Sequence, residues 1–365
     1  MTHPALALTW RVASLIAAGV GGFLVLALAV RLFAPVSTPP FRDASGGPLA
    51  NSIAVTERWS INGADQSVVI RGRDLSNPVL IWIGDLWCET PVLRHFNAGL
   101  EDRFVVVYWC QRYSGQSLDP LAPRPAQLTL DQYVDDLGAL VERVRARLHK
   151  DKVVLVGHSS GTAIGLIYTQ RNPEHVTAYV GVGQIVNFGD SLKRAYAFAL
   201  AEAQARRRAP AIADLERIGP PPYASDASTA VLRRWTIAFG GAFHGDLSYA
   251  KLALMSAGAS EANWRDLAAF IRTDSYVAPV YREMSGLAFD RGDLRFAAPV
   301  FLVSGRYDHR SDAELARDYL ETITAPAKTF VWFEHSAHSP PFEEPAAFDA
   351  WLVAHVRPLA TAQTQ

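Results

Sequence analysis

The segment Val153-Val-Leu-Val-Gly-His-Ser-Ser-Gly161 carries the clearest structural signal in the chain. Residues 153–156 are an apolar, mostly β-branched run, which is typical of a buried strand. The next residues have the form G-x-S-x-G, and residues 161–171 continue as a predicted helix. A strand that turns through G-x-S-x-G into a helix exposes its serine hydroxyl at the top of a sheet. We therefore predict that Ser159 is a nucleophile and that the Ser160 N–H, at a helix N-terminus, is an oxyanion donor.

Alternating strands and helices extend outward from this segment. The predicted strands are residues 68–71, 79–83, 104–109, 152–157, 179–182, 300–303 and 329–333. A helix begins at Thr129, which stands in capping-box spacing with Gln132, and apolar residues recur at helical intervals to Leu148. This order predicts an α/β fold with a mostly parallel sheet covered by helices on both faces.

A long region between the predicted strands 179–182 and 300–303 divides the sheet domain in two. Residues 188–287 show a helical pattern without a convincing strand, so we expect a helical lid inserted into the sheet domain. The sheet domain itself is then made of residues 51–187 and 288–365. A chain of 365 residues is long enough for such a core and a smaller lid.

The N-terminal region has a different composition. Residues 12–30, VASLIAAGVGGFLVLALAV, carry no charge, and about 20 apolar residues as a helix span a bilayer. We expect residues 1–33 to be a transmembrane anchor and residues 34–50, rich in proline and glycine, to be a linker. The alternative is a cleaved signal peptide, because Ala27-Leu28-Ala29 has the A-x-A form.

The overall composition excludes several classes of function. The formal net charge is −1, which does not indicate a nucleic-acid partner. There is no metal-ligand spacing and no dinucleotide-binding motif, so no cofactor is expected. The partners expected from the residues are a membrane, through the apolar N-terminal segment, and a small-molecule substrate for the nucleophile predicted at Ser159.

Two further residues complete a predicted catalytic triad. In folds with a nucleophile elbow the partners follow in the order Ser, Asp or Glu, His. Asp308 ends the turn after the strand at 300–303, and His338 lies just after the last strand. His338 would accept and return the Ser159 proton, and Asp308 would orient its imidazole. From the residues alone, the rivals of His338 are His335 and His309, and the rival of Asp308 is Asp312.

Several blocks together resemble the proline iminopeptidase-like (prolyl aminopeptidase) branch of the α/β-hydrolase fold family. Ile61-Asn62-Gly63, Ile70-Arg71-Gly72 and Asn77-Pro78-Val79-Leu80 are similar to its opening strands. The other blocks are Val107-Tyr108-Trp109 with Gln111-Arg112 and Gly115-Gln116-Ser117, Gly305-Arg306-Tyr307-Asp308, and Ser336-Ala337-His338-Ser339-Pro340 with Glu343-Glu344-Pro345. The resemblance covers about residues 61–359 except much of the lid. It implies Ser159, Asp308 and His338 as the triad.

The chain departs from that family at two places. Gly84-Asp85-Leu86-Trp87-Cys88 replaces the H-G-G-P-G loop, whose second oxyanion N–H would come from about Leu86, and Cys110-Gln111-Arg112-Tyr113 replaces D-Q-R-G. Both cysteines lie in these blocks, at the ends of strands that the family fold makes neighbours. The resemblance therefore suggests a Cys88–Cys110 disulfide, which fits an exported domain outside the cytoplasm, periplasmic or on the cell surface. The alternative is two unpaired buried cysteines.

The triad implies acyl transfer to water, and the resemblance implies an aminopeptidase that acts on short peptides. Such an enzyme needs a carboxylate for the substrate amine, for which Glu283 and Asp85 are candidates. An esterase is the second possibility, with an apolar pocket formed by Trp235, Phe239, Phe243 and Trp264, although these residues would equally suit the core of the lid. A third is a binding protein of the same fold, catalytically impaired by its altered oxyanion loop.

Overall fold

The computed structural model describes residues 4–33, 35–119, 121–223 and 225–361, without the side chains of residues 4–15, 31, 32, 264, 265, 267, 268 and 270. The strands are β1 (Ile53–Ile61), β2 (Ala64–Gly72), β3 (Val79–Ile83), β4 (Val105–Cys110), β5 (Val153–His158), β6 (Val176–Val182), β7 (Val300–Gly305) and β8 (Lys328–Phe333). The α-helices before β7 are α1 (Pro4–Phe33), α2 (Thr90–Asn97), α3 (Leu130–Leu148), α4 (Ser160–Arg171), α5 (Phe188–Ala205), α6 (Ala209–Ile218), α7 (Asp226–Ala238), α8 (Tyr249–Gly258) and α9 (Trp264–Met284). After β7 come α10 (Ala313–Thr322), α11 (Pro340–Glu343), α12 (Pro345–Trp351) and α13 (Arg357–Thr361).

The strands form one sheet in the order β1-β2-β4-β3-β5-β6-β7-β8. Strands β3 to β8 pair in parallel, and only the β1–β2 and β2–β4 pairs are antiparallel. The prediction of a mostly parallel sheet is confirmed. Parallel strands need long crossover connections, which the intervening helices provide.

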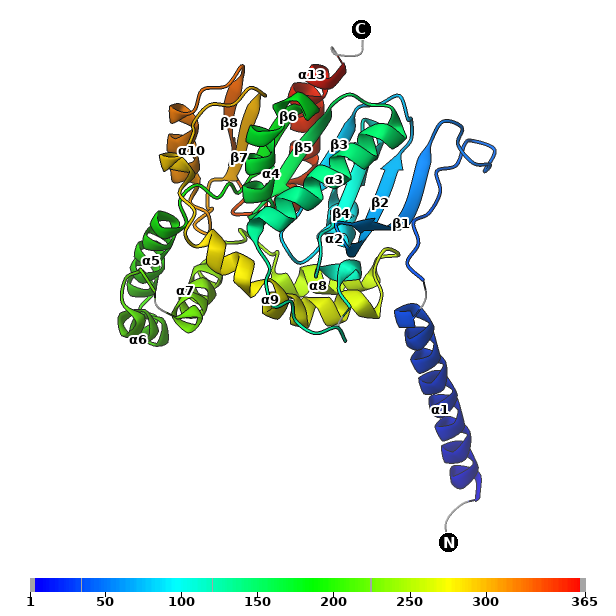
Figure 1. Cartoon of the computed structure of the whole chain (residues 1–365). Coiled ribbons are helices and arrows are strands. Elements are labelled where there is room, and N and C mark those ends of the chain that lie inside the picture. Colours follow the sequence, from blue (N-terminus) through cyan, green and yellow to red (C-terminus); the bar gives the residue numbers. More distant parts are fainter. Residues whose placement is uncertain (1–3, 34, 120, 224, 362–365) are drawn as a thin grey trace.

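Helices cover both faces of the sheet (Figure 1). On one face, alternate strand residues such as Ile81 and Leu155 pack with apolar residues of α3, α4 and α10. On the other face, Leu80 and Val154 pack with α2 and with the C-terminal helices around Phe348. Successive side chains of a strand point to opposite faces, so an almost continuous apolar run serves both layers.

The first strand was missed by the interpretation of apolar runs, and only the family resemblance pointed to it. β1 pairs with β2 from Ile53 opposite Gly72 to Ile61 opposite Ala64. Asn62 and Gly63 make the turn with φ of 46° and 76°, which is the positive-φ pattern of a type I′ hairpin. β1 was hard to recognise because it is largely half-buried and carries Glu57 and Arg58.

The helices α5 to α9, called here the insertion, lie between β6 and β7 and gather at one end of the sheet (Figure 1). α5, α6 and α7 share a small core of their own, built around Ala199, Leu215 and Leu232. The insertion also binds the sheet domain: the Gly241 carbonyl accepts the His309 N–H (3.0 Å) and the Ala242 carbonyl accepts the His338 N–H (3.2 Å). Its role as a lid stays a prediction.

Helix α1 projects away from the sheet and its covering helices (Figure 1). Within the described residues, no helix is long and apolar enough to cross a membrane. The structure therefore does not support the predicted transmembrane helix. The described part of the predicted span 12–30 is residues 16–30, shorter than the ~20 residues that a bilayer core requires, and residues 12–15 lie outside the described side chains.

Candidate active site

Ser159 occupies the sharp turn between β5 and α4. Its backbone has φ 53° and ψ −121°, and it precedes the first residue of α4. The turn needs glycine on both sides of the serine. A Cβ at Gly161 would lie 2.0 Å from the Ile83 carbonyl oxygen, and a Cβ at Gly157 would lie 2.8 Å from the Gly161 carbonyl oxygen. Only glycine permits such approaches. The strained φ of Ser159 lifts its side chain above the sheet edge, as the G-x-S-x-G motif requires.

His338 and Asp308 form a buried pair on the loops after β8 and β7. His338 Nδ1 lies 3.0 Å from Asp308 Oδ2. The other oxygen of Asp308 accepts the backbone N–H groups of Arg310 (2.9 Å) and Ser311 (3.0 Å). Burial lowers the pKa of the His338 imidazole below its usual 6.5, and the attraction to Asp308 opposes this only in part. Burial alone would raise the pKa of Asp308, but the attraction to His338 and the hydrogen bonds hold it below 3.8.

Ser159 and His338 both lie beside the carboxyl end of β6. The Ser159 N–H donates to the Val182 carbonyl (3.0 Å). A Cβ on the next residue, Gly183, would lie 2.7 Å from His338 Cε1. His338 Nε2 is buried and makes no hydrogen bond within the described part of the chain. The nitrogen that a serine hydroxyl would use is therefore uncommitted, and such hydrogen bonds often form only when substrate is bound.

The rival residues lie in other surroundings. His335 is exposed, and the His309 ring stacks on Phe198 with 3.8 Å between centroids. Asp312 caps α10 by accepting the Leu315 N–H (2.9 Å) and pairs with Arg194. Of these residues, only His338 and Asp308 face each other.

The histidine loop is held by Glu343, whose role was not foreseen from the sequence. Its carboxylate accepts the N–H groups of Ala337 (3.1 Å), Ser339 (3.0 Å) and His244 (2.5 Å). Burial raises the pKa of Glu343 to about 7. Because three donors converge on one carboxylate, this residue fixes the backbone on both sides of His338.

A second unforeseen pair links the loops around the nucleophile. His158 Nδ1 lies 2.6 Å from Glu89 Oε1, and its Nε2 is 3.3 Å from both the His338 carbonyl and Ser339 Oγ. Burial opposes protonation, but the Glu89 carboxylate outweighs it and raises the pKa of His158 above 6.5. The residue before the nucleophile thus ties the elbow to the histidine loop and to the loop after β3.

The loop after β3 places Asp85 and Leu86 beside Ser160. The Leu86 N–H lies 2.9 Å from Asp85 Oδ1 and 3.1 Å from Ser160 Oγ. Leu86 was predicted as the second oxyanion donor, but here its N–H is already engaged by its neighbours. The Ser160 N–H, the first predicted donor, makes no hydrogen bond within the described residues. In this arrangement one predicted donor is free to receive an oxyanion.

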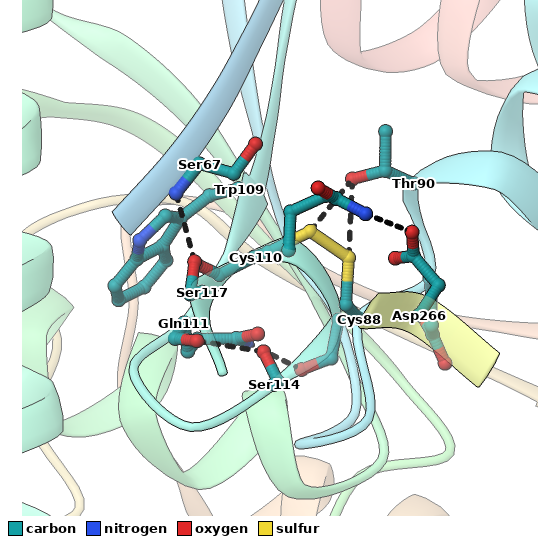
Figure 2. Close-up of a disulfide and its surroundings, with 12 residues drawn as sticks. Ser67, Cys88, Thr90, Trp109, Cys110, Gln111, Ser114, Ser117 and Asp266 are labelled. Atoms are coloured by element: carbon teal, nitrogen blue, oxygen red, sulfur yellow. Dashed lines mark hydrogen bonds between the residues drawn. A yellow bond between two sulfur atoms is a disulfide. The ribbon is translucent and has the colours of Figure 1, made fainter. Parts of the chain in front are cut away.

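A disulfide joins Cys88 to Cys110, with 4.7 Å between their Cα atoms. Figure 2 shows it between the loop after β3 and the end of β4, with Thr90 Oγ1 near both sulfurs. The predicted pairing is confirmed, and the alternative of two unpaired cysteines is wrong. The bond fastens the Gly84–Cys88 loop to the sheet, which supports the altered oxyanion loop from its far end.

Replacing both Cys88 and Cys110 by serine should lower stability by about 3 kcal/mol, because the bond closes a loop with a sequence separation of 22 residues. The measurement is urea unfolding of the variant beside the oxidised and reduced parent protein. A thiol count in denaturant without reductant should find no free thiol. Two free thiols, or an unfolding midpoint that reduction does not change, would contradict the bond.

A cavity of about 540 Å³ opens onto Ser159 between the sheet domain and the insertion. Its apolar lining is Ile185, Phe188, Leu192, Ala195, Ala230, Leu232, Ile237, Ala242, Ala278 and Met284. Its ionisable lining is Tyr223, Asp226, Arg233, Asp274, Tyr281, Arg282, His309 and Arg310. A mostly apolar cleft with a few charged groups beside a nucleophile has the character of a substrate pocket.

The acidic groups predicted for the substrate amine are both committed elsewhere. Glu283 accepts the Leu130 N–H (2.7 Å) at the start of α3, and Asp85 is buried against Ser160. Asp274 lines the cavity instead and makes no ion pair within the described residues. Asp274, Ala278 and Tyr281 follow one another at helical spacing along α9, and all three line the cavity.

The aromatic residues proposed for an acyl pocket pack elsewhere. Trp235 and Phe239 stack in the core of the insertion, with 5.7 Å between ring centroids. Phe243 packs edge-on against Tyr249. None of these three lines the cavity, and the side chain of Trp264 lies outside the described ones. Packing in the core of the insertion, the alternative interpretation, is correct for Trp235 and Phe239, whereas Phe243 packs in the core on one face of the sheet.

Comparisons with known proteins agree with this architecture. Residues 83–345 match the alpha/beta hydrolase fold family. The chain is 29% identical over 328 residues to a Bacillus subtilis (strain 168) protein named probable aminopeptidase YbaC, covering 85% of this chain and 98% of that protein.

Two crystal structures show the same fold. One is proline iminopeptidase of Mycobacterium smegmatis, with TM-score 0.61, 14% identity and coverage of 85% of this chain and 100% of that one. The other is a proline iminopeptidase-related protein of Thermus thermophilus, with TM-score 0.59, 20% identity and coverage of 85% and 99%. The resemblance inferred from the sequence motifs is confirmed by these matches.

Proposed function

Because the chain belongs to the α/β-hydrolase fold family, we propose that it is a serine hydrolase with Ser159 as nucleophile, His338 as general base and acid, and Asp308 as the group that orients His338. One observation carries the proposal. The elbow serine opens into a cavity, and a buried His338–Asp308 pair stands at the same end of the sheet with Nε2 uncommitted.

The proposed chemistry is acyl transfer in two steps. Ser159 Oγ attacks the substrate carbonyl carbon while its proton passes to His338 Nε2, and the Ser160 N–H stabilises the oxyanion. The bond to the leaving group breaks as His338 returns the proton to it. Water then attacks the acyl-enzyme by the same route, which releases the acid and regenerates Ser159.

The proposed substrate is a short peptide that loses its N-terminal residue. Support comes from the aminopeptidase-named relative and from Asp274, a carboxylate in the cavity without an ion pair among the described residues. A carboxylate that receives a protonated amine forms a charge-assisted hydrogen bond. Helix α9 carries Asp274, so the insertion would select for a free N-terminus.

Replacing Asp274 by asparagine should lower kcat/KM for aminoacyl anilides by roughly 10- to 100-fold, the worth of one hydrogen bond to a charged group. Esters without an amine should be unaffected. Asp226→Asn is the matched control. Asp226 lines the same cavity, but its Oδ2 lies 3.9 Å from Arg282 Nη1, so it already has a cationic partner. Equal losses on both substrates, or equal losses in both variants, would contradict the assignment.

A second candidate is an esterase for small apolar esters, favoured by the apolar lining of the cavity. Parallel assays with aminoacyl anilides and short-chain esters separate the two. A higher kcat/KM for esters, together with an Asp274→Asn variant whose kcat/KM for aminoacyl anilides is unchanged, would replace the aminopeptidase assignment.

Labelling with a fluorophosphonate probe tests the nucleophile itself. Peptide mapping should place the label on Ser159 and not on Ser160, and Ser159→Ala should abolish it. No labelling of the folded parent protein would instead favour a binding protein of this fold, the alternative that the engaged Leu86 N–H supports.

The pH dependence of activity should reflect the buried imidazole. His338 must be neutral to accept a proton, and burial lowers its pKa below 6.5. As pH falls, activity is therefore kept through pH 6.5 and lost only at lower pH. The measurement is the pH profile of kcat/KM for an uncharged ester. An acidic midpoint above pH 6.5 would contradict this environment.

The proposed location of the domain is extracytoplasmic, supported by the disulfide. Attachment to a membrane through α1 stays a prediction from the sequence, consistent with the exposed apolar side chains at Val20, Phe23 and Leu24. Protease added to spheroplasts, in which the outer face of the inner membrane is accessible, and a carbonate wash of membranes test the two statements separately. A protected domain would refute the first, and release by carbonate would refute the second.

A further inference from the structure

A buried carboxylate lies beside the predicted oxyanion site. Asp85 Oδ1 accepts hydrogen bonds from Ser160 Oγ (2.5 Å), the Leu86 N–H (2.9 Å) and Tyr281 Oη (3.2 Å). The Asp85 side chain is 9% exposed. These contacts join the loop after β3, the first turn of α4 and helix α9 through one carboxylate.

This position creates an electrostatic conflict with the proposed reaction. Burial alone would raise the pKa of Asp85, but Arg310 and the hydrogen bonds hold it below 3.8, so the group is an anion. During acyl transfer a second negative charge forms at the N–H of Ser160, the residue whose hydroxyl Asp85 binds. Like charges repel strongly where water is excluded. An anion at this place would raise the barrier unless another group balances it.

Arg310 is the balancing group. Its Nη2 lies 3.8 Å from Asp85 Oδ2, and its Nη1 donates to Tyr249 Oη (2.7 Å). Its side chain is 22% exposed, and it lines the same cavity as Ser159 and Ser160. The backbone of Arg310 also donates to Asp308. One residue therefore touches the triad carboxylate through its main chain and Asp85 through its side chain.

Resting on the proposed hydrolase function, we propose that Asp85 and Arg310 are a pair of positioning residues: Asp85 fixes Ser160 and Leu86, and Arg310 neutralises Asp85 so that the oxyanion can form. Neither residue contacts the reacting atoms. The pair takes the place of a glycine-rich loop, which needs no such compensation because it carries no charge.

The variants that test this are Arg310→Gln, Arg310→Lys and the double variant Asp85→Asn/Arg310→Gln, compared with the parent protein. Arg310→Gln leaves the anion uncompensated and should lower kcat about 100-fold, the scale of losing one oxyanion interaction, with little change in KM. Arg310→Lys keeps the positive charge and should stay within about 10-fold of the parent. The double variant removes both charges and should recover most of the kcat that Arg310→Gln loses.

The assays are steady-state kinetics on an uncharged ester and the rate of fluorophosphonate labelling, with thermal unfolding of every variant. A kcat for Arg310→Gln close to that of the parent would overturn the proposal. So would a folded double variant no faster than Arg310→Gln, because removing the Asp85 charge would then not relieve the loss. If Arg310→Gln does not fold, the proposal requires both Arg310→Lys and the double variant to be active. A parent protein without labelling would refute the hydrolase function instead, so the two failures are distinct.

Discussion

Replacing Ser159 by alanine should lower kcat on the order of a million-fold, as expected when a nucleophile that acts as a unit with its base is removed. The alanine would keep the Cβ and the φ of 53°, and Ser159 Oγ makes no hydrogen bond among the described residues. We therefore expect thermal unfolding to change little. The loss should lie in kcat and not in KM, because the missing bond forms only during the reaction.

The measurement is the initial rate on a short-chain ester and an aminoacyl anilide at high enzyme concentration, with unfolding curves of both proteins. A folded Ser159→Ala variant that retains a percent or more of the parent kcat would place the nucleophile elsewhere. Ser160 would then be the first candidate, because its hydroxyl lies in the same turn.

Replacing Asp308 by asparagine should lower kcat by about 10⁴-fold with folding retained. The Asp308 carboxylate accepts from His338 Nδ1, which leaves Nε2 without a proton and able to accept one. An asparagine amide can donate to Nδ1, which stabilises the opposite tautomer and removes the base. It also removes the negative charge that stabilises the imidazolium.

Asp312→Asn is the matched control, because Asp312 was the rival acid and lies on the same loop. Its side chain caps α10, and asparagine caps helices as well as aspartate. We expect an unchanged kcat for this variant. Similar losses in both variants would show that the effect comes from the loop and not from the His338–Asp308 pair. The readouts are kcat on the ester and the unfolding midpoint.

Local patterns were sufficient for much of the fold. The apolar runs at β3, β5 and β7 predicted buried strands because each is short and bounded by turn residues. Thr129 and Gln132 marked the start of α3, and both halves of the capping box are present. β1 escaped because its side chains are half-buried and mixed in polarity, a pattern that apolar periodicity does not detect.

Contacts between distant segments were not predictable in the same way. Asp85 was considered as a group for the substrate amine, yet it is paired with Arg310, which lies far along the chain on the loop after β7. Glu283 was the other candidate, and it caps α3 instead. The partner of a charged side chain depends on which loops fold onto one another, and neither sequence spacing nor composition contains that information.

The sequence by itself determined seven of the eight strands, the G-x-S-x-G turn at Ser159 and the candidate acid and base, because these depend on short-range periodicity, on turns that only glycine permits and on a known chain order. The resemblance to a family added the pairing of Cys88 with Cys110. Only the tertiary structure decided that the exposed Asp274 lines the cavity. It alone also decided which buried charges share a site: Asp85 with Arg310, Glu89 with His158, and Glu343 with the histidine loop. The physical reason is that a buried charge must find a partner wherever packing places it, and packing brings together residues from both ends of the chain.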